Sequence, residues 1–212
     1  MTTNTKRSSA KALLEIGAIR FSPTSPITFK SGIRSPVYVD NRRLIYHPAA
    51  WHVIIEGFKT LIETRQLPFD IIAGVAVGGV PHSSALAYNM SLPSVFIRKE
   101  TKGHGMGNRV EGGPVAGRRV LLVEDLITTG GSSLSAVEAL RAAGAMVTDA
   151  LAIISYGFDE ARLAFDRADI ALHALTNFQC LLELAQGEQL LTAEQLTRIR
   201  RWLADPQAWD AQ

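Results

Sequence analysis

Apolar residues along the chain fall into two kinds of pattern, short unbroken runs and longer stretches with a helical period. The unbroken runs predict five strands, at residues 71–77, 94–97, 120–124, 147–155 and 170–175. The stretches between them predict helices at 83–90, 132–143 and 159–167, and a longer helix is predicted from Pro48 to about Gln66. Because strand and helix alternate with short connections, the sequence predicts an α/β fold with a doubly wound, mainly parallel sheet.

The two ends of the chain follow other patterns. Residues 1–8 are polar and are expected to be frayed, and a short helix that stops at Gly17 follows them. Three prolines and a Val-Tyr-Val alternation in residues 21–47 predict a small irregular β element outside the main sheet. Near the C-terminus, Thr192 and Gln195 resemble a capping box and predict a last helix.

Composition fits one globular domain. A chain of 212 residues with 47% hydrophobic content can bury a full core. We therefore expect a single domain over residues 1–212, with an N-terminal region of about 1–47 and an α/β core of about 48–212. The single cysteine, Cys180, excludes internal disulfides and a cysteine-based zinc site, and it is predicted to be a small buried residue on a helix.

Charge and hydropathy limit the partners and the location that we expect. The net charge of +2 is too small to indicate a nucleic-acid partner. No run of 18 apolar residues occurs, and the polar start lacks the apolar segment of a signal peptide. We expect a cytoplasmic protein with no membrane partner.

Residues 120–132 carry the strongest chemical signal in the chain. The strand predicted at 120–124 ends in Glu124 and Asp125, and residues 128–133 then supply hydroxyls, two adjacent glycines and backbone N–H groups before a helix. Carboxylates can accept hydrogen bonds from ribose hydroxyls, directly or through a metal, while such a loop holds a 5′-phosphate. The alternative is a plain strand-turn-helix connection with an Asx-type cap.

This stretch resembles the phosphoribosyl-pyrophosphate (PRPP) signature of type I phosphoribosyltransferases. The resemblance implies a five-stranded, mainly parallel core sheet with a small N-terminal hood. It also implies that PRPP contacts Glu124, Asp125, Leu126, Ile127, Thr128, Thr129, Gly130, Gly131 and Ser132. The signature does not identify the base that accepts the phosphoribosyl group.

A second signal is the basic segment 98–109, which holds four fixed cations, one histidine and three alternating glycines. Glycine at every second position favours a segment that moves, so we expect a mobile loop at about 98–112. Its cations can neutralise a departing pyrophosphate, and His104 can supply a proton or a hydrogen bond. The alternative is a solvated hairpin or loop.

The arrangement Arg98-Lys99-x-x-Lys102-x-His104-Gly is similar to the catalytic loop of orotate phosphoribosyltransferases. In that family the loop closes over the active site of the neighbouring subunit. The resemblance therefore implies a homodimer in which Lys99, Lys102 and His104 act in trans, with Arg98 supporting the phosphates. The expected catalytic groups are Lys99, Lys102, His104 and Asp125.

The segment 29–40 is expected to serve the acceptor base. A base with a carboxylate needs a cation or aligned amides and an apolar face, which Lys30, Tyr38 and the Thr128 hydroxyl can provide. The segment is similar to the Lys-Ser-Gly…Ser-Pro-x-Tyr/Phe element of the same family, in which the lysine lies near orotate and PRPP. Taken alone, Lys30 also fits an ordinary surface lysine.

Residues 74–81 resemble the loop that cradles pyrophosphate in these enzymes. Some family members have a lysine where this chain has Gly78, so the backbone amides of residues 77–79 are the expected donors. In some members an arginine beyond the fourth strand meets orotate, but residues 155–158 offer no counterpart. His82 follows this loop and is expected to line the start of a helix.

The resemblance implies the reaction of orotate with PRPP to give orotidine 5′-monophosphate and pyrophosphate, a pentosyltransferase step of de novo UMP biosynthesis. It implies Mg²⁺ held mainly by PRPP with help from Asp125, since this ion usually binds phosphates and keeps several waters. His47, His52 and His173 lack the spacing of metal ligands. Two alternatives remain: another PRPP-dependent base phosphoribosyltransferase, or a non-catalytic PRPP-sensing regulator that binds nucleic acid.

Overall fold

A computed structural model describes residues 3–28, 34–99 and 109–206. Its centre is a six-stranded sheet in the order β10-β9-β8-β5-β6-β7. The strands are β5 (Ile71–Val75), β6 (Ser94–Ile97), β7 (Val110–Glu111), β8 (Val120–Ile127), β9 (Asp149–Ser155) and β10 (Ala171–Asn177). The five predicted strands are all present and mutually parallel, while β7 adds a short antiparallel edge beside β6.

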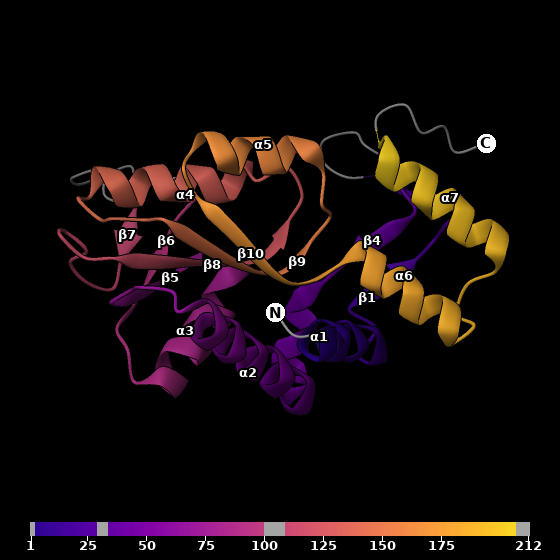
Figure 1. Cartoon of the computed structure of the whole chain (residues 1–212), viewed down its shortest axis with the longest axis horizontal. Helices are drawn as coiled ribbons and strands as arrows, with labels where there is room; N and C mark the ends of the chain where they lie inside the picture. Colours follow the sequence, from indigo (N-terminus) through magenta and orange to yellow (C-terminus); the bar gives the residue numbers. More distant parts are fainter. Residues whose placement is uncertain (1–2, 29–33, 100–108, 207–212) are drawn as a thin grey trace.

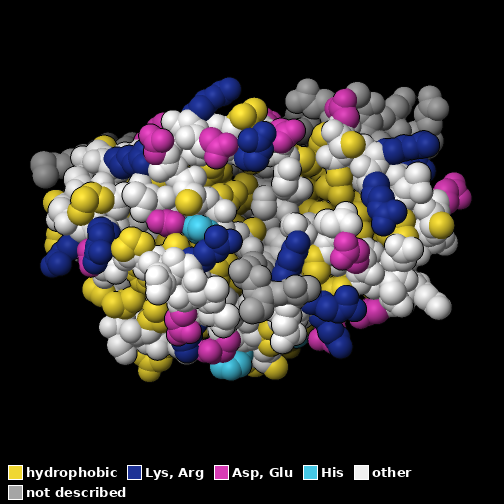
Figure 2. All heavy atoms as spheres, in the orientation of Figure 1, with side chains coloured by type: hydrophobic (Ala, Val, Ile, Leu, Met, Phe, Trp, Pro, Cys, Tyr) yellow, Lys and Arg dark blue, Asp and Glu magenta, His cyan; other side chains and the backbone are white. Residues whose placement is uncertain are grey.

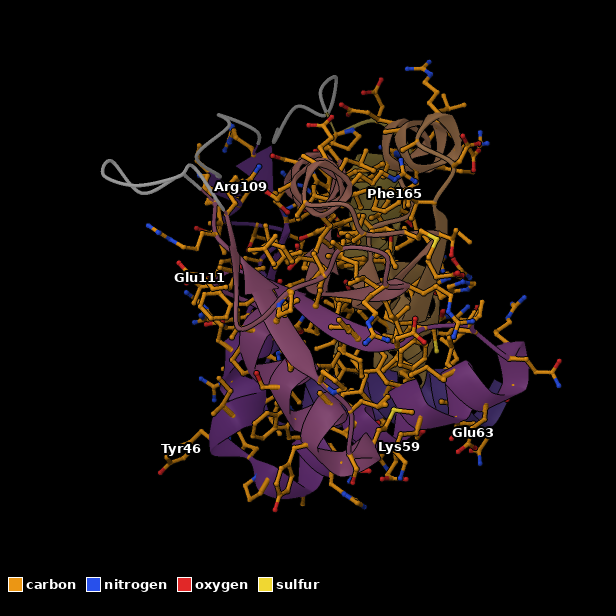
Figure 3. The ribbon with its side chains drawn as sticks, turned by 90° about the vertical axis from the view of Figure 1, so that its left-hand side faces the viewer. Tyr46, Lys59, Glu63, Arg109, Glu111 and Phe165 are labelled. Carbon is orange, nitrogen blue, oxygen red and sulfur yellow. The ribbon has the colours of Figure 1, made fainter. Side chains whose placement is uncertain are left out.

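Helices cover both faces of this sheet (Figure 1). The helices α4 (Gly131–Ala142) and α5 (Asp159–Arg167) lie on one face, and α2 (Pro48–Arg65) and α3 (Gly79–Met90) lie on the other. Figure 3 shows the same two layers edge-on, with Phe165 on the side of α5 and Lys59 on the side of α2. This arrangement confirms the predicted doubly wound fold.

Neighbouring residues of the central strands belong to different apolar cores. Ile71 and Leu122 pack in the core beneath α4 and α5, whereas Ile72 and Leu121 pack in the core that includes α2. Alternate side chains of a strand point to opposite faces, so a strand covered on both faces must be apolar at every position. The unbroken apolar runs in the sequence follow from this burial.

Strand β8 is longer than predicted and continues to Ile127. Its last registered pair with β5 is Gly74↔Val123, but its pairing with β9 continues to Ile127↔Ser155. The acidic pair was expected at the end of the strand and instead lies within it. Pairing with β5 thus ends before the acidic pair, while pairing with β9 continues past it. This difference leaves a hollow beside Glu124 and Asp125 at the carboxyl end of the strands.

The N-terminal region forms small sheets of its own. Strand β1 (Ile19–Phe21) pairs with β4 (Val37–Val39), and β2 (Ile27–Thr28) pairs with β3 (Arg34–Ser35), both antiparallel. This confirms the predicted β element outside the main sheet. A 3-10 helix, η1 (Asn41–Tyr46), follows β4 and was not predicted.

Helix α1 (Thr3–Glu15) corrects the expectation that residues 1–8 are frayed, because it begins at Thr3. Its residues Ala10 and Leu13 are fully buried in the core shared with α2, and this packing compensates for a polar first turn. At the other end, α6 (Phe178–Gly187) holds the buried Cys180, as expected of that cysteine. Helix α7 (Ala193–Ala204) opens with the predicted capping box.

Two further features concern the surface. Figure 2 shows Lys and Arg side chains interspersed with Asp and Glu over the face that it presents. Among the described residues, no helix combines the length and the apolar character needed to cross a membrane.

Candidate active site

The acidic pair on β8 is largely shielded from solvent, with Glu124 buried and Asp125 half-buried. Glu124 is 6% exposed, and its carboxylate accepts hydrogen bonds from the Asp125 backbone N–H at 3.0 Å and from the Ser133 hydroxyl at 3.2 Å. Burial, followed by the charge of Asp125, raises the pKa of Glu124 well above its ordinary value. Burial also raises the pKa of Asp125. The two carboxyl groups therefore resist being charged together, and a cation bound beside them would relieve that cost.

The loop after β8 leads directly into the N-terminus of α4. Gly130, the residue that caps this helix, has φ +86°, and a Cβ atom there would lie 2.7 Å from the Phe165 ring. Glycine is the residue that accepts this backbone conformation without strain. Having no side chain, Gly130 leaves the first N–H groups of α4 available to an anion, as predicted for a phosphate site.

The acidic pair and this loop share one cavity of about 410 Å³, which we call the main cavity. Residues from three parts of the chain line it: Val39, Asp40, Arg42, Val75, Ala76, Val77, Gly78, Glu124, Asp125, Leu126, Thr128, Thr129, Gly130, Gly131, Ser132 and Ser133. All but one of the predicted signature residues are among them. Ile127 is the exception, because its side chain is 1% exposed and packs in the core beneath α4.

The segment between β5 and α3 forms one wall of the main cavity. It contains a cis peptide bond between Ala76 and Val77. Helix α3 begins at Gly79, four residues before its predicted start, because Pro81 falls in the first turn, where no backbone N–H is needed. A Cβ atom on Gly79 would lie 2.4 Å from the Val123 carbonyl oxygen, so glycine lets α3 approach β8 closely.

Gly78 stands where the resemblance implies a lysine in some family members, and its surroundings fit a glycine. A Cβ atom at this position would lie 2.4 Å from the Asp125 carboxylate. A lysine here would need Asp125 to move, while glycine keeps the carboxylate and the backbone amides of this loop together. This contact supports the predicted use of backbone donors in place of a side chain.

A second cavity of about 320 Å³ lies beside the first, and we call it the basic cavity. It shares Val75, Ala76, Gly131 and Ser132 with the main cavity and adds Ile97, Arg98, Lys99, Arg109 and Ser135. Arg98 and Lys99 thus line a cavity that shares residues with the phosphate loop of their own chain, and the Arg98 guanidinium lies 3.6 Å from the Glu111 carboxylate. Lys102 and His104, like Lys30, lie outside the described residues.

Arg109 was missed as a site residue. Its Nε donates to the Arg98 carbonyl at 2.8 Å, and its Nη1 donates to the backbone and hydroxyl oxygens of Ser135 at 3.0 and 2.9 Å. Figure 3 places Arg109 on the same side of the sheet as Phe165. It therefore ties the end of the basic segment to helix α4. The sequence signal that could have identified it is its place as the last cation of the glycine-rich basic segment.

The N-terminal region supplies another wall of the main cavity. Arg42 Nε donates to Asp40 Oδ1 at 2.6 Å, and Arg42 Nη2 donates to the Tyr38 hydroxyl at 3.4 Å. The hydrogen bond from Arg42 lowers the pKa of Asp40. Asn41 is buried, and its amide donates to the Asp125 carbonyl at 2.6 Å, which fixes η1 to β8. The structure thus places the Tyr38 hydroxyl against Arg42, and the predicted contact of Tyr38 with the base stays a prediction.

His82 belongs to the interior and does not line either cavity. The Trp51 indole donates to His82 Nδ1 at 2.9 Å, and burial lowers the pKa of His82 to about 4. This agrees with its predicted place at the start of a helix. Over the described ranges, no three His, Cys, Asp or Glu side chains come together as a metal cage.

Comparisons with known proteins agree with this geometry. The family model for the phosphoribosyl transferase domain matches residues 43–161, more than half of the chain. The orotate phosphoribosyltransferase of Coxiella burnetii is 42% identical over 200 residues, covering 94% of this chain and 96% of that protein.

Two solved structures are also similar. The orotate phosphoribosyltransferase of Aeropyrum pernix has a TM-score of 0.75 and 32% identity, over 84% of this chain and 98% of that one. The Mycobacterium tuberculosis orotate phosphoribosyltransferase in complex with PRPP has a TM-score of 0.66 and 25% identity, over 82% of this chain and 98% of that one. The chain therefore belongs to the orotate phosphoribosyltransferase family of phosphoribosyltransferases.

Proposed function

We propose that this protein transfers the phosphoribosyl group of PRPP to orotate, giving orotidine 5′-monophosphate and pyrophosphate. This is a pentosyltransferase step of de novo UMP biosynthesis. The observation that carries the proposal is the main cavity, in which the pair Glu124 and Asp125 lies beside the open N-terminus of α4. A relative of similar fold that binds PRPP adds support.

Each part of PRPP has a complementary group in this site. Glu124 and Asp125 accept hydrogen bonds from the ribose hydroxyls, and the loop residues Thr129 to Ser132 hold the 5′-phosphate with amides and hydroxyls. The amides of residues 77–79 and the cations of the basic segment receive the pyrophosphate. Since the ribose develops oxocarbenium character as pyrophosphate leaves, the rate depends on stabilising that departing charge.

Mg²⁺ fits the donors that are present. The buried carboxylate of Glu124 and the half-buried one of Asp125, both with pKa values raised by burial, favour a nearby cation, and hard oxygen donors suit this ion. Asp125 would help PRPP oxygens to hold it, where it would neutralise phosphate charge.

The partner subunit is proposed to complete the site. In a cytoplasmic homodimer, Lys102 and His104 of one chain would reach the pyrophosphate in the other, while Arg98 and Lys99 serve their own basic cavity. Mixing Lys102→Ala chains with Asp125→Ala chains should then restore activity, because one site of each hybrid keeps both groups. Verified hybrids without activity would contradict the trans arrangement.

One assay tests the proposed reaction directly. Purified protein is mixed with orotate, PRPP and Mg²⁺, and the loss of orotate absorbance is followed. Adenine in place of orotate tests for a purine phosphoribosyltransferase, and omission of PRPP is the control. If PRPP binds but no base is consumed, the protein is a PRPP-binding regulator and the proposal is wrong.

A further inference from the structure

The acceptor base proposed above carries a carboxylate, and that group needs a cation when it leaves water. The segment after β9 does not supply one. Tyr156 is 6% exposed and stacks on Phe178 with ring centroids 4.3 Å apart, and on Phe158 at 5.3 Å. The residues that follow β9 therefore pack in the core shared with α6 and α7. The cation that pairs with the carboxylate of the base must come from another segment.

Arg42 is the one lysine or arginine among the described residues that line the main cavity. Its side chain is 63% exposed, so solvent and ligand can both reach it. Its positive charge also acts on Asp125, where it partly opposes the burial that raises the pKa of that carboxyl group. Arg42 thus belongs to the wall that the N-terminal region contributes to the main cavity, which it shares with the β8 carboxylates.

Neighbouring groups hold Arg42 in a defined orientation. Asp40 engages Nε at 2.6 Å and the Tyr38 hydroxyl engages Nη2 at 3.4 Å. The described contacts leave Nη1 and the second hydrogen of Nη2 for a ligand. A planar guanidinium group whose orientation is already set by neighbouring groups suits bidentate binding of a carboxylate.

We propose that Arg42 binds the carboxylate of the acceptor base and so selects a carboxylated pyrimidine over the same ring without that group. Asp40 and Tyr38 act as positioning residues for its guanidinium. The inference rests on the proposed function, and it gives Tyr38 an indirect role in place of direct contact with the base.

A competing role for Arg42 is binding of a PRPP phosphate. The geometry favours the base, because the phosphate loop is shared with the basic cavity, where Arg98, Lys99 and Arg109 gather. Arg42 belongs to the main cavity alone. The two roles differ in which ligand loses affinity when the arginine is replaced.

The test compares two nucleotides that differ only by the carboxylate. Dissociation constants of orotidine 5′-monophosphate and uridine 5′-monophosphate are measured by calorimetry for the wild type and for Arg42→Met. The wild type should prefer orotidine 5′-monophosphate, and Arg42→Met should reduce that preference by about 100-fold, as expected for loss of a charge-assisted bidentate pair. Arg42→Lys keeps the charge but loses the paired N–H donors of the guanidinium, so its preference should lie between those of the wild type and Arg42→Met.

Arg43→Met is the matched control. Arg43 lies next to Arg42 on η1, but its Nε donates to the Ile16 carbonyl at 2.9 Å and it does not line the main cavity. This variant should keep the wild-type preference, and thermal unfolding shows whether each variant is folded.

Several outcomes would overturn the inference. A wild type without preference between the two nucleotides would do so, as would an Arg42→Met variant that loses equal affinity for both. Weaker PRPP binding with an unchanged preference would assign Arg42 to a phosphate. A wild type that fails to consume orotate would contradict the proposed reaction instead, whatever the nucleotide preference.

Discussion

The phosphate side and the base side of the main cavity are built in different ways. The phosphate side consists of the end of β8, its loop and the start of α4, with Glu124 buried and a helix terminus donating backbone N–H groups. The base side comes from β4 and η1, where the exposed guanidinium of Arg42 and the carboxylate of Asp40 face the cavity. Under the proposed function, the fold itself determines how phosphoribose binds, whereas a few side chains on a peripheral segment determine which base follows it.

The largest expected effect comes from removing a carboxylate on the phosphate side. Asp125→Asn should lower kcat/KM for PRPP by about 1,000-fold, because the ribose and its cation lose a charged partner. It should not destabilise the free protein, since the charge of Asp125 is one cause of the raised pKa of Glu124. Steady-state kinetics and thermal unfolding check the two halves of this prediction.

Asp70→Asn is the control for that variant, because Asp70 pairs with Arg119 at 2.7 Å on the surface. It should leave kcat/KM unchanged. If Asp125→Asn lost stability along with activity, the acidic pair would have a structural role, and the contrast between the two sides would weaken.

Gly79→Ala tests whether the phosphate side depends on close packing. The added Cβ atom would lie 2.4 Å from the Val123 carbonyl, so α3 must move away from β8, at a cost of about 1–3 kcal/mol. Urea unfolding should show this loss, and PRPP binding should weaken because the loop before α3 moves too.

Gly187→Ala is the matched control on α6, where no atom lies within 4 Å of the added Cβ. The same change there should be neutral or slightly stabilising. Equal losses at the two glycines would mean that the contact with Val123 is unimportant.

Asn41→Ala addresses the join between the two sides. It removes the hydrogen bond to the Asp125 carbonyl, and loss of one buried hydrogen bond costs about 1 kcal/mol. Because η1 then loses its tie to β8, KM for orotate should rise more than KM for PRPP. Asn89→Ala, at an exposed position of α3, is the control and should change neither value. A larger effect on PRPP would show that Asn41 serves the phosphate side.

The smallest effect concerns pH. The folded protein raises the pKa of Glu124 above its ordinary value of 4.5, so the folded state holds a proton that the unfolded chain releases. The stability linked to this group is therefore complete below pH 4.5 and decreases as the pH rises toward the folded-state pKa. Glu124→Gln should flatten that decrease in urea unfolding without ligand, whereas Glu138→Gln, at an exposed position, should not. An unchanged slope in Glu124→Gln would contradict the effect of burial.

The two sides also differ in how far the sequence predicts them. The apolar run of β8 and the hydroxyl-rich, glycine-containing loop predict the phosphate side, because each residue type there meets a local requirement for burial, turning or hydrogen bonding. The length of β8 is not predictable in this way, since it depends on pairing with β9 beyond the end of β5. Only the assembled sheet determines that pairing.

The base side was predicted less well. The residues of η1, from Asn41 to Tyr46, show no helical period. The sequence alone does not distinguish the roles of the adjacent arginines Arg42 and Arg43. Arg42 lines the main cavity, while Arg43 donates a hydrogen bond to the carbonyl of Ile16, the residue that follows α1. Such roles depend on contacts between distant segments, and the local pattern of the sequence does not contain them.

The backbone pairing of the N-terminal region has a consequence for how the family can change. Strands β1, β2, β3 and β4 pair only among themselves within the described chain, so no ladder bond of the six-stranded sheet depends on them. The segment from β4 to η1 is therefore tied to the main sheet by side chains, such as the Asn41 amide on the Asp125 carbonyl, and not by strand pairing. Under the proposed function, natural variation or protein engineering that keeps Asn41 can rewrite the other exposed positions of this segment for a new acceptor while the phosphoribose site keeps its fold.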